Sequence, residues 1–271
     1  MSCWRETSEG LEWISGNSAS SHWVLKWTNV MPGLYVKLAG EETYSGPYLG
    51  ALGITARGQG EPGNLDQSNI SQIEVVRDRV ELSFVPSGWH DTTVRYAWLP
   101  SGSDQFDLEL QVSTRSVGKL HGVELGVVSS AWTKPEKHQS WLVSMRDESA
   151  EIRSKDGRQS LWFANQTGFE LDGVVSGEDG RKVWPPSLMM SKRADLRFSE
   201  TAHPIDISRR YRSLSGITQQ TWTLGYPMER GVILRSRFRG RLLGSEENPD
   251  SNAINLWQSD FMANLCRSTT D

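Results

Sequence analysis

The chain has 271 residues, which is long enough to bury a sizeable core, and its 33 acidic and 29 basic residues give a net charge of −4. This balance lacks the overall positive field that attracts nucleic acid, so we expect no nucleic-acid partner. No apolar run reaches the roughly 20 residues of a membrane helix, and residues 1–10 lack the layout of a signal peptide. We therefore expect no membrane association and a cytoplasmic location.

The sequence contains none of the common motifs for nucleotide, hydrolase or zinc chemistry. There is no GxGxxG, P-loop, GxSxG or HExxH pattern. The two cysteines, Cys3 and Cys266, stand at opposite ends of the chain and outside any zinc-binding spacing. They are either two free thiols or a disulfide that joins the two ends. We expect neither a metal nor another cofactor.

Period-two alternation predicts β-strands along much of the chain. The clearest strand covers residues 106–112, with apolar residues on one face and Asp107, Glu109 and Gln111 on the other. Residues 94–98 alternate in the same way, and the turn residues between the two runs predict a hairpin. A second hairpin is expected from 73–75 and 80–84, and further strands are expected at 120–128, 141–145, 160–163, 169–174 and 231–243.

Short strands separated by Gly, Pro, Ser and Asp clusters indicate an all-β fold rather than βαβ units. We expect a large antiparallel two-sheet β-sandwich that forms one domain over residues 1–271. A helix is predicted at 253–266, where apolar residues recur at spacings of three and four after an Asp-Ser-Asn cap. It would pack on a sheet or against a partner. Residues 205–214, after Pro204, are a second and shorter helix candidate.

Twelve tryptophans are the most unusual feature of the composition. An indole has a broad apolar face and a polar N–H, which suits both a protein core and the apolar face of a sugar ring. We expect core positions for the tryptophans in phase with apolar neighbours, namely Trp98, Trp141, Trp162 and Trp257. Burial and ligand contact both stay open for the three in loops, which are Trp89, Trp132 and Trp184.

Three polar clusters are candidates for chemistry. In the first, His90 and Asp91 follow Trp89 in a loop, where an imidazole that titrates near neutral pH can serve acid/base work. The alternative is an aspartate that holds a turn beside an exposed histidine.

The second cluster lies on the expected strand at 120–128. Regular alternation puts His121 on the face of Val123 and Leu125, and Glu124 on the opposite face between two glycines. Those glycines leave space above the sheet for a substrate or for a bulky cross-strand side chain. A buried histidine with a hydrogen-bond partner is the plainer interpretation of His121. The loop that follows adds Trp132, Glu136 and His138.

The third cluster is an arginine at every second position from Arg235 to Arg241, which places four guanidinium groups on one strand face. Arg235 and Arg237 could hold an anion such as a sugar carboxylate or a phosphate. The interpretation we favour is a solvated face neutralised by acids across the strands, for which Asp107 and Glu109 are suitable partners.

The runs VRYAW at 94–98 and FDLELQV at 106–112, His121 on the next strand and the closing run ERGVILR at 229–235 share a strand rhythm with one known family. Through these runs the chain resembles the galactose-mutarotase-like supersandwich family of aldose epimerases and other carbohydrate-active domains. The resemblance implies a two-sheet supersandwich in which a strand-borne histidine acts as acid and a late glutamate as base at the sugar. The corresponding positions here are His121 and Glu229.

We therefore expect a carbohydrate-active protein, in the first instance an enzyme of the epimerase, glycosidase or lyase type. His121, Glu124 and Glu229 are its expected catalytic residues. A saccharide would contact the side chains Trp89, His90, Asp91, Trp132, Glu136, His138, Arg235 and Arg237. The alternative is a non-catalytic sugar-binding or assembly module. In that case Trp257 and the helix at 253–266 would contact another chain, as in a homo-oligomer.

Overall fold

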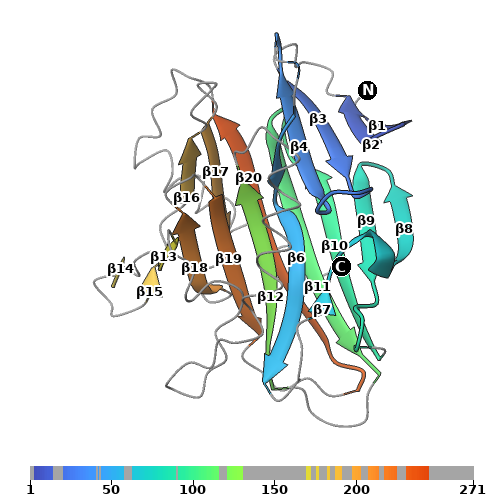
Figure 1. Cartoon of the computed structure of the whole chain (residues 1–271), viewed down its shortest axis with the longest axis vertical. Helices are drawn as coiled ribbons and strands as arrows, with labels where there is room; N and C mark the ends of the chain where they lie inside the picture. Colours follow the sequence, from blue (N-terminus) through green and yellow to red (C-terminus); the bar gives the residue numbers. More distant parts are fainter. Residues whose placement is uncertain are drawn as a thin grey trace.

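A computed structural model of the chain is shown in Figure 1. It describes residues 3–14, 21–40, 42, 44–57, 63–89, 91–115, 121–130, 169–171, 175–176, 182–183, 187–190, 197–202, 207–213, 217–224 and 230–243.

Every strand pair in this part of the chain is antiparallel, and most of the strands form three sheets. The seven-stranded sheet has the order β16 (Ser187–Met190), β17 (Arg197–Ala202), β20 (Ile233–Leu243), β11 (Gln105–Thr114), β10 (Thr92–Pro100), β9 (Arg79–Phe84) and β8 (Ile70–Val76). The six-stranded sheet has the order β13 (Phe169–Leu171), β18 (Ile207–Ser213), β19 (Ile217–Leu224), β12 (His121–Ser130), β6 (Gly50–Arg57) and β7 (Gly63–Asn64).

The five-stranded sheet runs in chain order through β1 (Cys3–Thr7), β2 (Gly10–Ile14), β3 (Ser21–Lys26), β4 (Gly33–Leu38) and β5 (Ser45–Tyr48). A separate ribbon pairs β14 (Val175–Ser176) with β15 (Lys182–Val183). One 3₁₀ turn, η1 (Gln67–Asn69), precedes β8 and is the only helical element among the residues named above.

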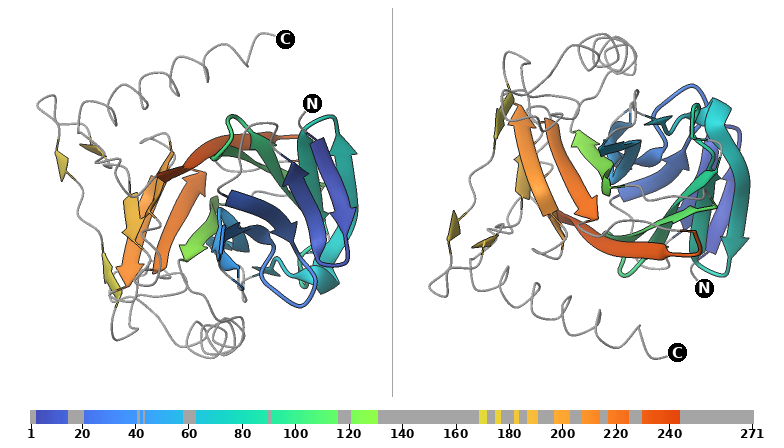
Figure 2. Two further views of the ribbon diagram at one scale, coloured as in Figure 1. Left: turned by 90° about the horizontal axis from the view of Figure 1, so that it is seen from above. Right: turned by 90° about the horizontal axis from the view of Figure 1, so that it is seen from below.

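The core lies between the seven-stranded sheet on one side and the five- and six-stranded sheets on the other. Its largest fully buried side chains come from both sides, and they are Trp23, Trp98, Tyr48, Tyr96, Phe84, Phe106, Phe198 and Phe238. The end-on views in Figure 2 show the two layers facing each other. The antiparallel two-sided sandwich expected from the alternation is therefore confirmed, with one layer divided into two sheets.

Several buried polar groups in this core have hydrogen-bond partners, most of them in the opposite layer. Trp98 donates from Nε1 to the Leu49 carbonyl at 3.0 Å, and the Tyr96 hydroxyl donates to the Gly126 carbonyl at 2.9 Å. The Ser129 hydroxyl accepts from the Leu49 amide at 2.8 Å and donates to the buried carboxylate of Glu200 at 2.6 Å. These bonds link β10 and β17 of one layer to β12 and to Leu49, between β5 and β6, in the other, and they fix how the layers are stacked.

Both expected hairpins are confirmed. Val94 lies opposite Val112 in the β10–β11 pair, and Ile73 lies opposite Leu82 in the β8–β9 pair. The helix expected at 205–214 is wrong, because residues 207–213 form β18 and pair with β19. Ile207 and Tyr211 are four residues apart, a spacing that fits one face of a strand as well as one face of a helix. The predicted helix at 253–266 and the predicted strands at 141–145 and 160–163 lie outside the described residues.

Two tryptophan predictions can be compared with the fold. Trp98 is fully buried, as expected from its phase with apolar neighbours. Trp89, for which burial and ligand contact were both open, is also in the core with 4% of its surface exposed. Its indole is therefore not a platform on which a sugar could stack.

The close approach of Phe198 to Gly240 gives a test of the core. A methyl group at Gly240 would stand 2.3 Å from Cζ of the Phe198 ring, so Gly240→Ala forces the ring out of place. We expect a loss of about 1–3 kcal/mol in the free energy of unfolding, measured by urea denaturation. Gly102→Ala is the control, because its nearest contact is Gln105 Cβ at 3.3 Å in an exposed turn. The Gly240→Ala/Phe198→Leu double variant should cost less than the sum of its single changes, and additive costs would contradict this account.

Candidate functional site

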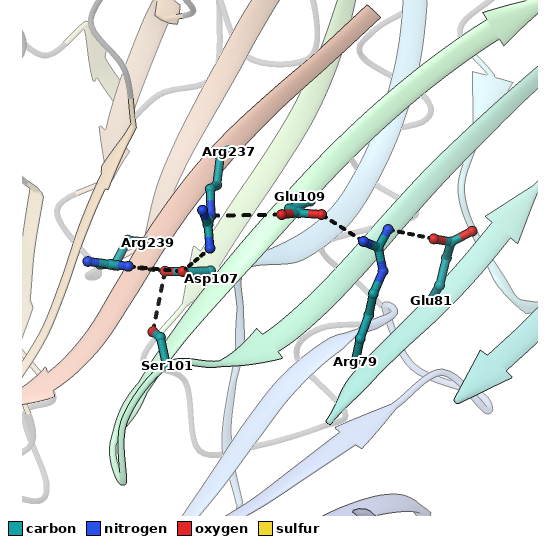
Figure 3. Close-up of polar contacts among 7 residues, drawn as sticks. All are labelled: Arg79, Glu81, Ser101, Asp107, Glu109, Arg237 and Arg239. Atoms are coloured by element: carbon teal, nitrogen blue, oxygen red, sulfur yellow. Dashed lines mark hydrogen bonds and ion pairs between the residues drawn. The ribbon is translucent and has the colours of Figure 1, made fainter. Parts of the chain in front are cut away.

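The outer face of the seven-stranded sheet carries a network of arginines and carboxylates (Figure 3). Arg239 binds Asp107 through two nitrogens at 2.6 and 3.0 Å, and Arg237 binds the same carboxylate at 2.6 Å. Asp107 is 1% exposed. A carboxylate this deeply buried is stable only when charged or hydrogen-bonding groups surround it, and the two arginines supply that compensation.

The network continues across two more strands, β10 and β9. Arg237 Nε is 4.0 Å from Glu109, Arg79 binds both Glu109 at 2.8 Å and Glu81 at 2.7 Å, and Arg95 is 3.6 Å from Glu81. Arg79 on β9 reaches Glu109 on β11 by passing over β10. Ala97 of β10 lies opposite both Glu81 and Glu109, and its small side chain leaves that path open.

The interpretation that we favoured for the arginine face is thus confirmed for Arg237, which is neutralised by Asp107 and Glu109 across the strands. Arg235 differs from it. Arg235 is exposed and lies opposite the neutral Gln111. Of the two arginines predicted to bind a ligand, Arg235 is therefore the more accessible to an external anion.

A second polar surface is centred on β12, in the middle of the six-stranded sheet. Glu124 is partly buried and lies opposite Thr55 of β6 on one side and Thr223 of β19 on the other. The space above Gly126, where we expected either a substrate or a bulky cross-strand side chain, is occupied by Leu52 of β6. A Cβ at Gly126 would be 2.9 Å from Leu52 Cδ2.

A β-bulge changes the relation between His121 and Glu124. The strand pair β6–β12 matches His121 with Arg57 and Glu124 with Thr55, so three steps on β12 span two steps on β6. One extra residue on β12 shifts the alternation by one position. The prediction that His121 and Glu124 occupy opposite faces is therefore wrong, because the register assigns both positions to the same face. Gly122 and Val123 are the two residues between the matched positions of β12. Gly122 permits such a bulge because it has no side chain that could clash.

The other predicted site residues are not brought to this surface by the described structure. Asp91 is exposed in the turn before β10, where its carbonyl accepts from the Arg115 amide at 2.7 Å. His90, Trp132, Glu136, His138 and Glu229 lie outside the described residues.

A third polar cluster, on the five-stranded sheet, was missed by sequence reasoning. His22 of β3 contacts the Glu12 carboxylate of β2 through Nε2, and its Nδ1 is 3.1 Å from the Tyr44 hydroxyl. Arg5 of β1 donates to Glu12 from Nε at 3.2 Å, and the Lys26 ammonium stands 3.7 Å from the centre of the Tyr44 ring. These residues come from four separate segments, so no spacing in the sequence could have indicated the cluster.

The geometry of the cluster defines a carboxylate–imidazole–phenol relay. The Nε2 contact with Glu12 and the Nδ1 contact with the Tyr44 hydroxyl join these two side chains through the imidazole ring, and the tautomer of His22 decides which atoms donate. Burial would raise the pKa of Glu12, but hydrogen bonds and charge from Arg5 and His22 outweigh it and lower the pKa below its usual value. Burial, together with the carboxylates Glu9 and Glu12, raises the pKa of Tyr44, so its hydroxyl keeps its proton at neutral pH.

No group of three or more His, Cys, Asp or Glu side chains in the described ranges could hold a metal ion. None of the helices formed by those residues has the length and apolar character needed to span a membrane.

No protein-family model matches the chain, and no curated protein matches it. Among solved structures it is similar to a kojibiose phosphorylase candidate from the human microbiome, with TM-score 0.45, 8% identity, and coverage of 97% of this chain and 30% of that one. It is also similar to the heparan sulfate lyase HepC of Pedobacter heparinus, with TM-score 0.37, 7% identity, and coverage of 92% and 37%.

A third similar structure is a galactose mutarotase-related enzyme of Lactobacillus acidophilus, with TM-score 0.32, 9% identity, and coverage of 92% of this chain and 99% of that one. The chain spans about a third of the length of the first two proteins. All three TM-scores are below 0.5.

Asp107 and Glu109 form a matched pair for testing the network. Asp107→Asn leaves Arg237 and Arg239 without their buried counter-charge, and we expect the free energy of unfolding to fall by about 3–5 kcal/mol. Glu109→Gln removes a charge from a side chain that is one-third exposed, and we expect a loss of about 0–1 kcal/mol. Urea denaturation of both variants measures the difference. Equal losses would contradict a buried centre at Asp107.

Glu12 gives a prediction of pH dependence. Because its pKa is lowered in the folded protein, its stabilising effect is fully present above the usual pKa of 4.5 and is lost as the pH falls through the folded-state pKa. Glu12→Gln should therefore cost about 1–2 kcal/mol at pH 7 and less at pH 3, measured by urea unfolding at both values. The control is Glu6→Gln on the adjacent strand, where the side chain is exposed. A cost that is independent of pH would show that the charge of Glu12 is not responsible.

Proposed function

We propose that the protein is carbohydrate-active and carries out acid/base chemistry at a sugar anomeric centre or glycosidic bond. The observation that supports this most directly is the bulge of β12, which brings the positions of His121 and Glu124 onto one face of the six-stranded sheet. An imidazole and a carboxylate on one face are the pair that protonates and deprotonates sugar oxygens near neutral pH.

The environment of Glu124 suits such a role. It is partly buried in the central strand, and neighbours that carry hydroxyl groups lie opposite it on both sides. Partial burial strengthens the interaction of a carboxylate with a positively charged transition state, because less water screens it. In the proposed site His121 acts as the acid and Glu229 as the base, by analogy with the mutarotase-like family, and Glu124 stabilises the developing charge or replaces Glu229.

The proposed contacts with the saccharide come from several parts of the chain. Trp132 would stack on the apolar face of the ring. Arg235 lies on the outer face of the opposite layer, so it would bind a hydroxyl or a carboxylate of a separate sugar there. The side chains of His90, Asp91, Glu136 and His138 are proposed as further polar contacts. Arg237 can contribute only beside its two acidic partners, and the buried Trp89 is no longer proposed.

A second candidate function is a non-catalytic sugar-binding or assembly module, in which residues 253–266 contact another copy.

The relay of Glu12, His22 and Tyr44 is an alternative location for acid/base work, since it joins a proton donor to an oriented base. It would act on a different face from the one proposed above.

Substitution of the two β12 residues distinguishes an enzyme from a module. Against a panel of neutral and acidic glycosides, we expect Glu124→Gln and His121→Gln to lower turnover by about 10²–10⁴-fold while glycan binding is retained. Glu6→Gln, on the exposed face of β1, is the control and should leave turnover unchanged. Turnover would be followed by chromatography and binding by calorimetry.

The other outcomes identify the competing functions. A protein that binds glycans and turns over none of them is the module. Turnover that survives both β12 substitutions but is lost in His22→Gln would move the chemistry to the relay.

A further inference from the structure

The strand β8 forms an open edge of the seven-stranded sheet. It pairs with β9 on one side, and in the described part of the chain no strand pairs with its other side (Figure 1). Every residue from Ser71 to Val76 is exposed. The backbone N–H and C=O groups that point away from β9 are therefore available to another strand.

The side chains of this edge are unusually apolar. The exposed large hydrophobic residues in the described part of the chain are Ile73, Val75, Val76 and Ile233, and the first three of them lie in β8 with 43%, 49% and 57% of their surface exposed. Edge strands are commonly protected from pairing by lysine or proline. β8 contains neither, and its bulge lies at the start, between Ile70 and Gln72, which leaves 72–76 as a regular segment.

We propose that β8 pairs antiparallel with β8 of a second copy of this chain and joins two seven-stranded sheets edge to edge. Directly opposed residues of such a pair lie on the same face, so one residue must lie opposite its own copy, and the two-fold axis passes midway between the two. An axis at a given residue means that this residue is the one opposite its copy. The side chains of β8 decide which residue it is.

An axis at Ile73 is the register that the side chains favour. It places Ile73 opposite its own copy and Val75 opposite Ser71 on one face, and Gln72 opposite Glu74 on the other. A glutamine amide donates well to a carboxylate, and these two side chains already form such a bond within one chain at 2.5 Å.

The registers with the axis at Glu74 and at Val75 are unfavourable. An axis at Glu74 sets two carboxylates directly opposite each other, and an axis at Val75 sets Ile73 against Arg77 and Glu74 against Val76. Because the regular segment is short, the interface is small, and we expect a reversible dimer that forms with increasing concentration.

Sedimentation velocity over a concentration series tests the association. With increasing concentration, the mass obtained for the unmodified chain should rise towards twice that of one copy. Ile73→Lys should abolish this rise, because it places two ammonium groups at the axis. Ile233→Lys is the matched control, because Ile233 is equally exposed on another strand. The proposal is overturned if the chain stays monomeric, if Ile73→Lys still dimerises, or if Ile233→Lys abolishes the dimer as fully as Ile73→Lys does.

Disulfide trapping tests the register. In a background with Cys3→Ser and Cys266→Ser, Ile73→Cys should crosslink two copies on mild oxidation. Opposed Cα atoms in an antiparallel pair are about 4.5–5.5 Å apart, within the span of a disulfide at about 4.4–6.8 Å. Val75→Cys should not crosslink, since two copies of that position lie about 13 Å apart in this register. Efficient crosslinking through Val75→Cys instead would refute an axis at Ile73.

Discussion

The pairing of β20 with β11 is the constraint on which the rest of the fold depends. β20 comes from the end of the described chain and lies between β17 and β11, so without it the seven-stranded sheet would separate into two parts. The buried carboxylate of Asp107 joins the two strands, because it lies opposite Arg239 and is also bound by Arg237. A slip of two residues would put Arg237 or Arg241 opposite Asp107, so the arginine repeat alone does not set the register, but it would move Gly240 away from Phe106.

This register has consequences on the inner face of the same strands. With Asp107 matched to Arg239, Gly240 falls opposite both Phe106 and Glu200, and the ring of Phe198 lies over its bare Cα. Glu200 can then accept from Ser129 in the opposite layer. The outer ion pairs and the inner aromatic packing thus depend on the same alignment, and each stabilises the other.

Regular alternation was enough to predict the strands of the two hairpins, because Phe106, Leu108 and Leu110 repeat without interruption. It failed in the first 64 residues, where the structure has seven strands and we predicted none. Residues 50–56 of β6 are buried on both faces, so no polar–apolar alternation marks them. The bulge in β12 and the contact between Glu12, His22 and Tyr44 depend on pairing between distant segments. Local periodicity carries no information on such pairing, so the face shared by His121 and Glu124 could not have been predicted.

The two surfaces that could carry acid/base chemistry differ in their exposure to water. In the relay, the His22 side chain is 42% exposed, so water screens its charge and exchanges protons with it directly. Glu124 is partly buried on the central strand of its sheet, where a charge interacts more strongly with nearby groups. Stabilising a transition state requires dipoles and charges that are fixed and poorly hydrated. This physical difference is the reason why our proposal prefers β12 to the relay, whose contacts also hold β2 and β3 to the segment before β5.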